Sequence, residues 1–329
     1  MNACMRSAGL ARGLLVLCMA AGLAACSRAP GPVADTAAEP AAEALEALRN
    51  AMPDTPGTGR FPALKETDAT LPGQVIYRPA SLAAMGSTRL GVYAFGNGAC
   101  TDDAAHTRLH LLEVASHGYL VIVPGAFYTG PGAIERPADL PPAGPDAVLT
   151  RHEQLAEAIT WALAENARPG SPYHGRIDPQ AIAVSGFSCG GLQALFNARD
   201  PRVRTVVMMN SGLFPDGPTT MAGMSGDKSL LETVHTPILY VLGGESDMAY
   251  APGMDDFAHL THVPAAVASI DKGHGGTFWE PDGGAAAQVV VNWLEWQLRG
   301  DEAAGRMFKG EDCGLCRDPA WVLQTRGLE

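Results

Sequence analysis

One stretch near the middle of the chain, residues 181–196, constrains the fold more than any other. It begins with a short apolar run, Ala181–Val184, and continues with residues 186–190, Gly-Phe-Ser-Cys-Gly. An apolar segment with helical spacing follows over residues 192–196. A strand, a sharp turn and a helix in this order match the pattern G-x-S-x-G, in which the turn presents a serine hydroxyl above the edge of a sheet. Ser188 is therefore a candidate nucleophile, which needs a base, an acid and an oxyanion hole.

Short apolar runs alternate with helix-like segments from about residue 70 onwards. The fully apolar run Tyr119–Val123 is typical of a strand buried on both faces of a parallel sheet. This alternation predicts βαβ crossovers, and with them an α/β fold with a mostly parallel central sheet and helices on both faces. The predicted strands occupy residues 74–77, 89–95, 119–123, 181–184, 204–209, 237–242 and 265–270. The main predicted helices begin near residues 102, 149 and 285, and residues 212–230 leave room for a small cap.

Two later strands end in loops that carry the residues a serine nucleophile needs. Asp247 follows the run 237–242, and His274 lies in a glycine-rich loop after the run 265–270. The order Ser188, Asp247, His274 is the nucleophile, acid and base order of an α/β-hydrolase fold. His274 would accept the serine proton, and Asp247 would orient the imidazole. The alternative acids are Glu245, Asp255, Asp256 and, after the preceding strand, Asp216.

An oxyanion hole requires two backbone N–H groups near the serine. The first is expected from Cys189, the residue after the nucleophile, and the second from the loop 95–100, with Gly96 or Asn97 as its donor. No dinucleotide-binding glycine pattern follows the first strand, and no cluster of His, Asp and Glu shows metal-ligand spacing. The sequence therefore predicts neither a cofactor nor a metal.

The first 25 residues form a separate unit. Arg6 and Arg12 accompany an apolar run, Gly13–Leu23, that is too short for a membrane span. The sequence Leu-Ala-Ala-Cys that ends at Cys26 resembles the lipobox of bacterial lipoproteins. The resemblance implies cleavage before Cys26 and a lipid anchor on its thiol. Because Ser27 rather than aspartate follows, it also implies the outer membrane of a Gram-negative bacterium, with the chain facing the periplasm or the surface. An ordinary signal peptide is the alternative.

Composition divides the chain into three segments. Residues 1–25 are predicted as a lipoprotein signal peptide. Residues 26–69, which are rich in Ala, Pro, Gly, Thr and Glu, are predicted as a lipid-anchored flexible tether, and residues 70–329 as the catalytic domain. The formal net charge is −12, and no basic patch appears that could neutralise phosphates. A nucleic-acid partner is therefore not expected.

Four cysteines remain in the predicted mature chain beyond the lipidation site: Cys100, Cys189, Cys313 and Cys316. An even number in an exported protein suggests two disulfides, which these residues could form in three ways. Cys313 and Cys316 are close enough to pair locally, which leaves Cys100 with Cys189. That second bridge would join the oxyanion loop to the nucleophile turn. Two buried free thiols at these positions are the alternative.

Five segments together resemble one group of known enzymes: residues 95–100, 186–191, 243–250, 273–278 and 293–300. They are similar to secreted α/β-hydrolases of the dienelactone-hydrolase-like and polyester-hydrolase-like (cutinase-like) group, over about residues 70 to 320. The resemblance implies a serine esterase that cleaves small-molecule or polymeric esters through an acyl-enzyme, using Ser188, Asp247 and His274. Dienelactone hydrolases proper carry cysteine where this chain has Ser188. An acyltransferase or a peptidase with the same triad, and a non-catalytic binding lipoprotein, are the alternatives.

Overall fold

The structure is a computed structural model, and it describes residues 38–142 and 147–328. The predicted signal peptide and the lipidation site at Cys26 lie outside these residues. The chain divides into two compact units, Met1–Ala44 and Leu45–Glu329, and the second unit holds the sheet and the predicted triad. Within the described ranges, none of the helices combines the length and the apolar composition that crossing a bilayer requires.

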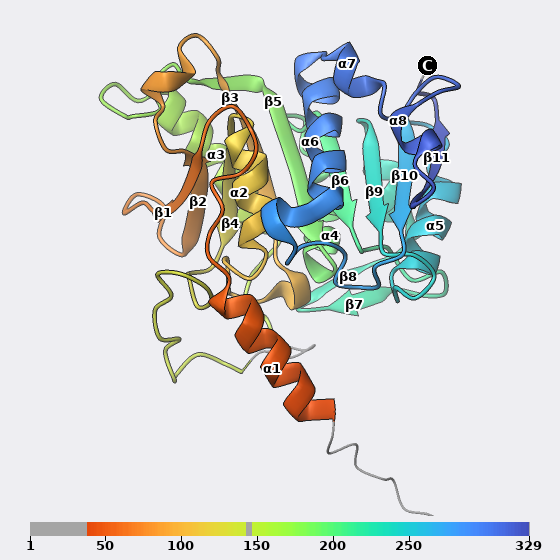
Figure 1. Cartoon of the computed structure of the whole chain (residues 1–329), viewed down its shortest axis with the longest axis horizontal. Coiled ribbons are helices and arrows are strands. Elements are labelled where there is room, and N and C mark those ends of the chain that lie inside the picture. The colour runs from red at the N-terminus through yellow and green to blue at the C-terminus, as the bar shows by residue number, and fades with distance from the viewer. Residues whose placement is uncertain (1–37, 143–146, 329) are drawn as a thin grey trace, which may run out of the picture. The chain divides into compact units, whose positions relative to one another are not determined.

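A nine-stranded sheet forms the centre of the second unit (Figure 1). Its strands are β1 (Ala63–Thr67), β2 (Gln74–Pro79), β3 (Leu90–Gly96), β4 (Tyr119–Pro124), β5 (Ile177–Phe187), β6 (Thr205–Met209), β9 (Ile238–Leu242), β10 (Ala265–Ile270) and β11 (Trp321–Arg326). They lie in the order β1-β2-β4-β3-β5-β6-β9-β10-β11. The strands from β4 to β10 in this order are parallel, whereas β1, β2 and β11 are antiparallel to their neighbours. The predicted α/β architecture with a mostly parallel sheet is confirmed.

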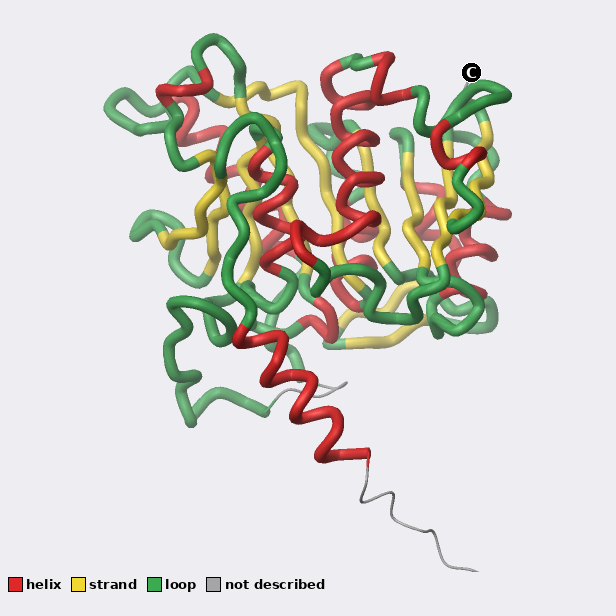
Figure 2. Tube along the Cα trace, in the orientation of Figure 1, coloured by secondary structure: helices red, strands yellow, loops and turns green. Residues whose placement is uncertain are grey.

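Helices pack on both faces of this sheet (Figure 2). The helices are α1 (Ala38–Ala51), α2 (Arg108–Ser116), α3 (Glu153–Ala167), α4 (Cys189–Asn197), α5 (Tyr250–His259), α6 (Gly284–Arg299), α7 (Glu302–Gly305) and α8 (Gly314–Arg317). Short 3-10 helices occupy Ala83–Met85, Gly98–Cys100, Lys228–Thr233 and Pro281–Gly283. Apolar side chains of α3, α4 and α5 form one core, and those of α2 and α6 form the other.

Strand β3 shows why apolar runs of this kind form a two-faced sheet. Successive side chains of a strand point to opposite faces. Val92 and Ala94 accordingly lie in the core with α3 and α4, whereas Tyr93 and Phe95 lie in the core with α2 and α6. All four side chains are fully buried. Continuous apolar sequence is therefore needed here, because both faces are covered by helices.

The beginning of the compact unit differs from the tether expected over residues 26–69. The second unit starts at Leu45, and β1 pairs with β2 in the sheet. Strand β1 reads Ala-Leu-Lys-Glu-Thr, and all five residues are only half-buried or exposed. Such a strand is joined to the sheet mainly through backbone hydrogen bonds at its edge. It therefore has neither the apolar run nor the alternation that sequence reasoning relies on.

The helix expected to begin at Asp102 begins six residues later, at Arg108. The two acidic side chains that suggested a helix N-terminus have other partners. Asp102 forms an ion pair with Arg136 at 3.0 Å, and Asp103 accepts backbone N–H groups from Ala105 and Tyr128. Both carboxylates stabilise loops at the end of the sheet instead of capping a helix.

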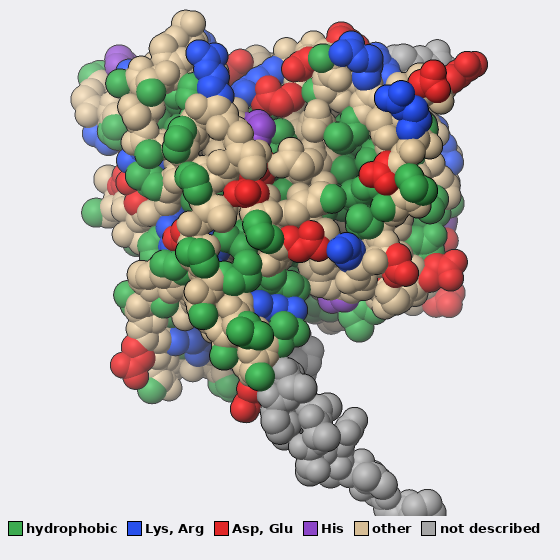
Figure 3. Space-filling model, viewed as in Figure 1, with side chains coloured by type: hydrophobic (Ala, Val, Ile, Leu, Met, Phe, Trp, Pro, Cys, Tyr) green, Lys and Arg blue, Asp and Glu red, His purple; other side chains and the backbone are tan. Residues whose placement is uncertain are grey.

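The small cap expected within residues 212–230 is a two-stranded hairpin. It consists of β7 (Thr219–Met221) and β8 (Met224–Gly226) and lies at the lower edge of the sheet in Figure 1. The face seen in the space-filling view carries acidic, basic and apolar side chains interspersed with one another (Figure 3).

Candidate active site

Ser188 occupies a strained turn between β5 and α4. Its backbone has φ 53° and ψ −118°, a conformation that non-glycine residues rarely adopt. A backbone hydrogen bond joins the turn to the end of β6: the Ser188 N–H donates to the carbonyl of Met209 at 2.9 Å. Strain at this position is retained because the surrounding strands and helix determine the path of the backbone. The hydroxyl consequently stands at the end of the strand, as the G-x-S-x-G pattern predicts.

The two glycines of the pattern are required by close backbone contacts. A Cβ atom on Gly186 would lie 2.0 Å from the carbonyl oxygen of Gly190. A Cβ atom on Gly190 would lie 2.0 Å from the carbonyl oxygen of Gly96. Both distances are far below any tolerated carbon–oxygen contact. The nucleophile turn and the loop after β3 therefore approach each other more closely than any residue with a side chain would allow.

The structure brings the three predicted triad residues into one hydrogen-bond chain. His274 Nε2 lies 2.9 Å from Ser188 Oγ, and His274 Nδ1 lies 2.6 Å from Asp247 Oδ1. The three residues follow β5, β9 and β10, at the carboxyl ends of the parallel strands, where α/β sheets place their ligands. Because an ionised carboxylate only accepts, the proton belongs on Nδ1. Nε2 is then free to accept the serine proton.

Asp247 is held as a charged carboxylate by four donors. Its side chain is buried and accepts hydrogen bonds from His274, from the backbone N–H groups of Gly243 and Ala249, and from the Asn210 amide. Burial by itself raises the pKa of this carboxyl, but the hydrogen bonds outweigh it, so the pKa lies below its usual range. A carboxylate that stays ionised at neutral pH stabilises an imidazolium at His274.

The four alternative acids lie elsewhere. Among the described residues, only Asp247 and Ser188 hydrogen-bond the His274 ring. Glu245 and Asp216 are exposed, and Asp255 forms an ion pair with Lys228 at 2.6 Å. Asp256 is buried beneath the loop after β6, where it accepts from the Leu213 N–H, from Lys228 and from Tyr240. Burial raises the pKa of Asp256, despite these donors.

Two polar residues at the end of β6 belong to the site and were not singled out from the sequence. Asn210 Nδ2 donates to Asp247 Oδ2 at 2.9 Å and to the carbonyl of Gly273 at 3.2 Å, so it joins the acid loop to the base loop. Ser211 Oγ donates to the carbonyl of Ser188 at 2.7 Å. The feature of the sequence that could have indicated them is the polar Asn-Ser-Gly directly after the apolar strand β6. Its importance depends on β6 lying between β5 and β9, which only the sheet order reveals.

The loop after β3 lies against the nucleophile turn. Gly96 is the last residue of β3 and is paired with Gly186, and Asn97 donates through its side chain to the carbonyls of Thr101 and Pro124. The residues of this loop that line a cavity together with Ser188 are Gly98 and Ala99. The second oxyanion donor at Gly96 or Asn97 therefore stays a prediction, whereas the closeness of the loop to Ser188 is a feature of the structure.

Both expected disulfides are present. Cys100 is bonded to Cys189 with their Cα atoms 5.3 Å apart, and Cys313 is bonded to Cys316 with their Cα atoms 5.0 Å apart. The alternative of two free thiols is therefore wrong. The first bridge joins the loop after β3 to the residue next to Ser188. It connects the two backbone segments from which the oxyanion donors are expected.

Two cavities open on Ser188 and His274. One has a volume of about 180 Å³ and lies beside the loops that follow β6 and β9. The other, of about 700 Å³, lies beside the loop after β3 and residues 128–136. Over the described ranges, no group of three or more His, Cys, Asp or Glu side chains is arranged to hold a metal ion.

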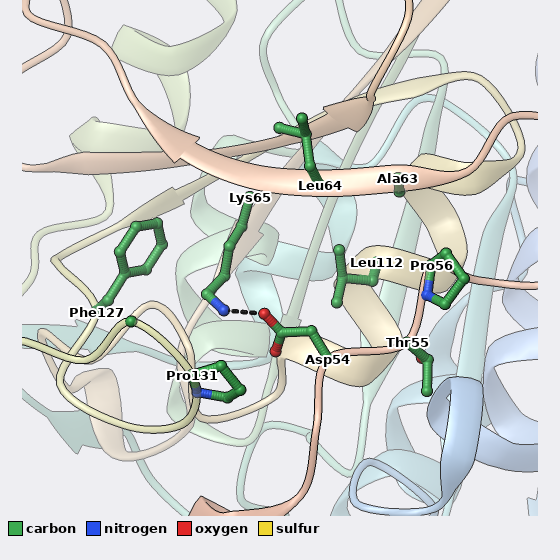
Figure 4. Close-up of a pocket in the computed structure, with 10 residues that line it drawn as sticks. Asp54, Thr55, Pro56, Ala63, Leu64, Lys65, Leu112, Phe127 and Pro131 are labelled. Carbon is green, nitrogen blue, oxygen red and sulfur yellow. Dashed lines mark hydrogen bonds and ion pairs between the residues drawn. The ribbon is translucent and has the colours of Figure 1, made fainter.

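A third cavity, of about 400 Å³, lies next to β1 and away from Ser188 (Figure 4). Lys65 and Asp54 form an ion pair across it, and Asp54 also accepts from Arg108 at 2.9 Å. Leu112 and Phe127 contribute apolar surface. The charged groups in this cavity thus satisfy one another, and its lining contains no nucleophile with a base.

The arrangement at Ser188 can transfer a proton from a hydroxyl to an imidazole and stabilise the resulting cation, which is the chemistry of an activated serine. The sequence matches no protein-family model, and no curated protein is significantly similar to it.

Proposed function

We propose that this protein is a serine hydrolase of the α/β-hydrolase fold that cleaves carboxylic esters. The observation that carries the proposal is the hydrogen-bond chain from Ser188 through His274 to Asp247, on a strained turn that faces two cavities. A serine with only a structural role would not require a positive φ. It would also have no reason to lie within hydrogen-bond distance of a histidine oriented by a buried carboxylate.

In the proposed reaction, Ser188 Oγ attacks the carbonyl carbon of the ester while its proton moves to His274 Nε2. The C–O bond to the alcohol then breaks, and the imidazolium returns the proton to the leaving oxygen. Water repeats the sequence on the acyl-enzyme and releases the acid. The Cys189 N–H and one N–H of the loop after β3 stabilise the oxyanion, and each such donor contributes about 3 kcal/mol to the transition state.

Export to an oxidising compartment is part of the proposal. Two disulfides support it, because reducing compartments keep cysteines as free thiols. Attachment through a lipid on Cys26, with outer-membrane placement, stays a prediction from the first 26 residues of the sequence.

The proposal is tested by p-nitrophenyl ester hydrolysis together with labelling by a fluorophosphonate probe. We expect the probe to modify Ser188, identified by peptide mass spectrometry. We expect Ser188→Ala and His274→Ala to lower kcat/KM by about four orders of magnitude or more. Two exposed residues provide matched controls, Ser225→Ala and His259→Ala, and both variants should retain full activity.

Several results would count against the proposal. Full activity in Ser188→Ala would remove the nucleophile. A folded wild-type protein with neither labelling nor hydrolysis would favour a non-catalytic binding protein. Comparison of an ester with the corresponding anilide decides between an esterase and a peptidase, since a peptidase would cleave the anilide at a comparable rate.

A further inference from the structure

We propose that the site is built for asymmetric esters, with a small apolar group on one side of the carboxylate and a bulky, neutral or cationic group on the other. We further propose that Met221 of the β7–β8 hairpin separates the two groups and sets the size limit of the smaller one. This inference rests on the serine hydrolase proposed above, whose Ser188 and His274 line both cavities.

The smaller cavity offers a substrate few polar groups that are not already hydrogen-bonded within the protein. Its apolar lining comes from Leu192, Phe214, Met221, Met248, Ala249 and Pro252. The other polar side chains of its lining are already engaged. Ser211 donates to the Ser188 carbonyl and Asn210 donates to Asp247. Thr219 accepts a backbone N–H at 2.6 Å. A polar substituent would therefore lose its water and gain few partners in return, so an apolar one is favoured.

The volume of the smaller cavity limits what it can hold. At about 30 Å³ for each water-sized group, a cavity of 180 Å³ accommodates about six non-hydrogen atoms. By the same measure the larger cavity, of 700 Å³, accommodates about twenty. The two sides of the ester therefore meet very different size limits.

The larger cavity has a different chemistry as well. Phe187 and Ala99 contribute apolar surface next to the serine, whereas Tyr128, Asp103 and Arg136 contribute polar groups. A bulky substituent with hydroxyl or amide groups would find hydrogen-bond partners in Tyr128 and Asp103, whereas Arg136 is already engaged by Asp102 and by the carbonyl of Pro141.

The charged side chains of the larger cavity further limit the kind of substituent that it can bind. The lining of the larger cavity includes three carboxylates, from Glu46, Asp102 and Asp103, but only one guanidinium, from Arg136. That guanidinium is paired with Asp102 at 3.0 Å, and Glu46 lies 3.6 Å from Arg49, so among the described residues Asp103 is the lining carboxylate without an ion-pair partner. The whole chain is also acidic, with a formal net charge of −12. An anionic substituent is therefore disfavoured relative to a neutral or cationic one.

Met221 is the structural element between the two cavities. Within the described part of the chain, it is the only residue besides Ser188 and His274 that lines both. It ends β7 and is paired with the buried Met224 of β8. The far end of the hairpin is anchored by Lys228, whose ammonium donates to Asp256 at 2.6 Å and to the carbonyl of Leu213 at 2.9 Å. The Met221 side chain is therefore presented by a backbone that is attached to the core.

Pairs of isomeric esters test the proposal. One series keeps an ethyl alcohol and lengthens the acyl chain, and the other keeps an acetyl group and lengthens the alcohol, so that ethyl hexanoate is compared with hexyl acetate. In the series whose growing group enters the smaller cavity, kcat/KM should rise about fourfold per methylene up to about six atoms. Beyond that length it should fall at least tenfold. In the isomeric series, kcat/KM should continue to rise with chain length. The series in which kcat/KM falls shows whether the acyl group or the alcohol group occupies the smaller cavity.

Substitutions on β7 connect this limit to Met221. Met221→Ala removes three non-hydrogen atoms from the wall, so the limit should move to chains about three atoms longer in the restricted series. Thr220→Ala is the matched control, because this neighbour on β7 is exposed and does not line either cavity. It should leave the limit where it is in the wild-type protein.

The outcomes separate this inference from the proposed function. Equal limits in the two series, no limit in either, or an unchanged limit in Met221→Ala would overturn the asymmetry while Ser188 labelling by the fluorophosphonate probe still supports the hydrolase. Absence of both labelling and hydrolysis would overturn the hydrolase, and the inference with it. An ester with an anionic group on its bulky side should be cleaved more slowly than its neutral analogue. The opposite order would contradict the charge argument.

Discussion

The Cys100–Cys189 bridge should stabilise the protein far more than the second disulfide. In the chain-entropy treatment, a bridge with a sequence separation of 89 constrains the unfolded chain by about 4.6 kcal/mol at 25 °C. A separation of 3, as in Cys313–Cys316, contributes only about 1.9 kcal/mol. The double variant Cys100→Ala/Cys189→Ala should therefore lose between two and three times as much free energy of unfolding as Cys313→Ala/Cys316→Ala.

The same comparison has an activity readout. Cys189 supplies a proposed oxyanion donor, and Ala99 and Cys100, on the facing loop, both have a φ of 50°. Without the bridge, nothing covalent holds this strained loop against the nucleophile turn. We expect kcat to fall in the Cys100/Cys189 variant, by up to the roughly hundredfold that loss of one oxyanion donor causes. The Cys313/Cys316 variant should retain the wild-type kcat.

Urea unfolding followed by circular dichroism measures the first effect, and ester hydrolysis measures the second. Thiol titration of unfolded, unreduced mature protein should find no free thiol in the wild type. The reasoning fails if the two double variants are equally destabilised, or if the Cys100/Cys189 variant is the more stable of the two. An unchanged kcat in a destabilised Cys100/Cys189 variant would separate the stabilising role of the bridge from any role in the site.

Three further substitutions test other parts of the structure. Burial lowers the pKa of His110 from 6.5 to about 3, so below pH 6.5 the unfolded state binds a proton that the folded state does not. His110 should therefore contribute a loss of about 1.4 kcal/mol of stability per pH unit between pH 6.5 and 3. In urea unfolding at pH 7 and 4.5, His110→Phe should lose less stability than the wild type by that contribution. The methyl group of Gly190→Ala would collide with the Gly96 carbonyl, so the free energy of unfolding should fall by about 3 kcal/mol or more and Ser188 should no longer be labelled. Unfolding and labelling like those of the wild type would refute the contact. Asn210→Ala should cost about 2 kcal/mol of folding free energy and, because the carboxylate loses one donor, raise the pKa of Asp247. An NMR titration of the Asp247 carboxyl measures this, and an unchanged pKa would contradict the role of the Asn210 amide.

The interior of the sheet was predictable because its sequence obeys one physical requirement. A parallel strand covered by helices on both faces must be apolar at nearly every position, and runs such as Tyr119–Val123 or Ile238–Leu242 satisfy this requirement over their whole length. The candidate triad was predictable for a related reason. Parallel strands end at one edge of the sheet, so polar residues directly after apolar runs, such as Asp247 and His274, meet there.

The remaining elements were not predictable because their stability comes from partners distant in sequence. Strand β1 is half-exposed and joins the sheet through backbone pairing. In β11, an apolar run of only three residues, Trp321–Leu323, is followed by three polar residues, and Val322 is largely exposed, so the segment lacks the length of a recognisable strand pattern. The role of Asn210 depends on the neighbours of β6, and the offset start of α2 depends on the ion pair between Asp102 and Arg136. A local pattern cannot contain such information.

The bridge between the nucleophile turn and the facing loop has a consequence for maturation. A chain in a reducing cytoplasm holds every residue of the candidate triad but lacks the covalent link between Cys100 and Cys189. If the protein is exported as proposed, the link forms only after the chain reaches an oxidising compartment. In the exported esterase proposed above, full activity would then appear only after secretion, which would spare the producing cell the hydrolysis of its own intracellular esters. Oxidation would serve as the final step of biosynthesis, in place of the proteolytic activation that many secreted hydrolases require.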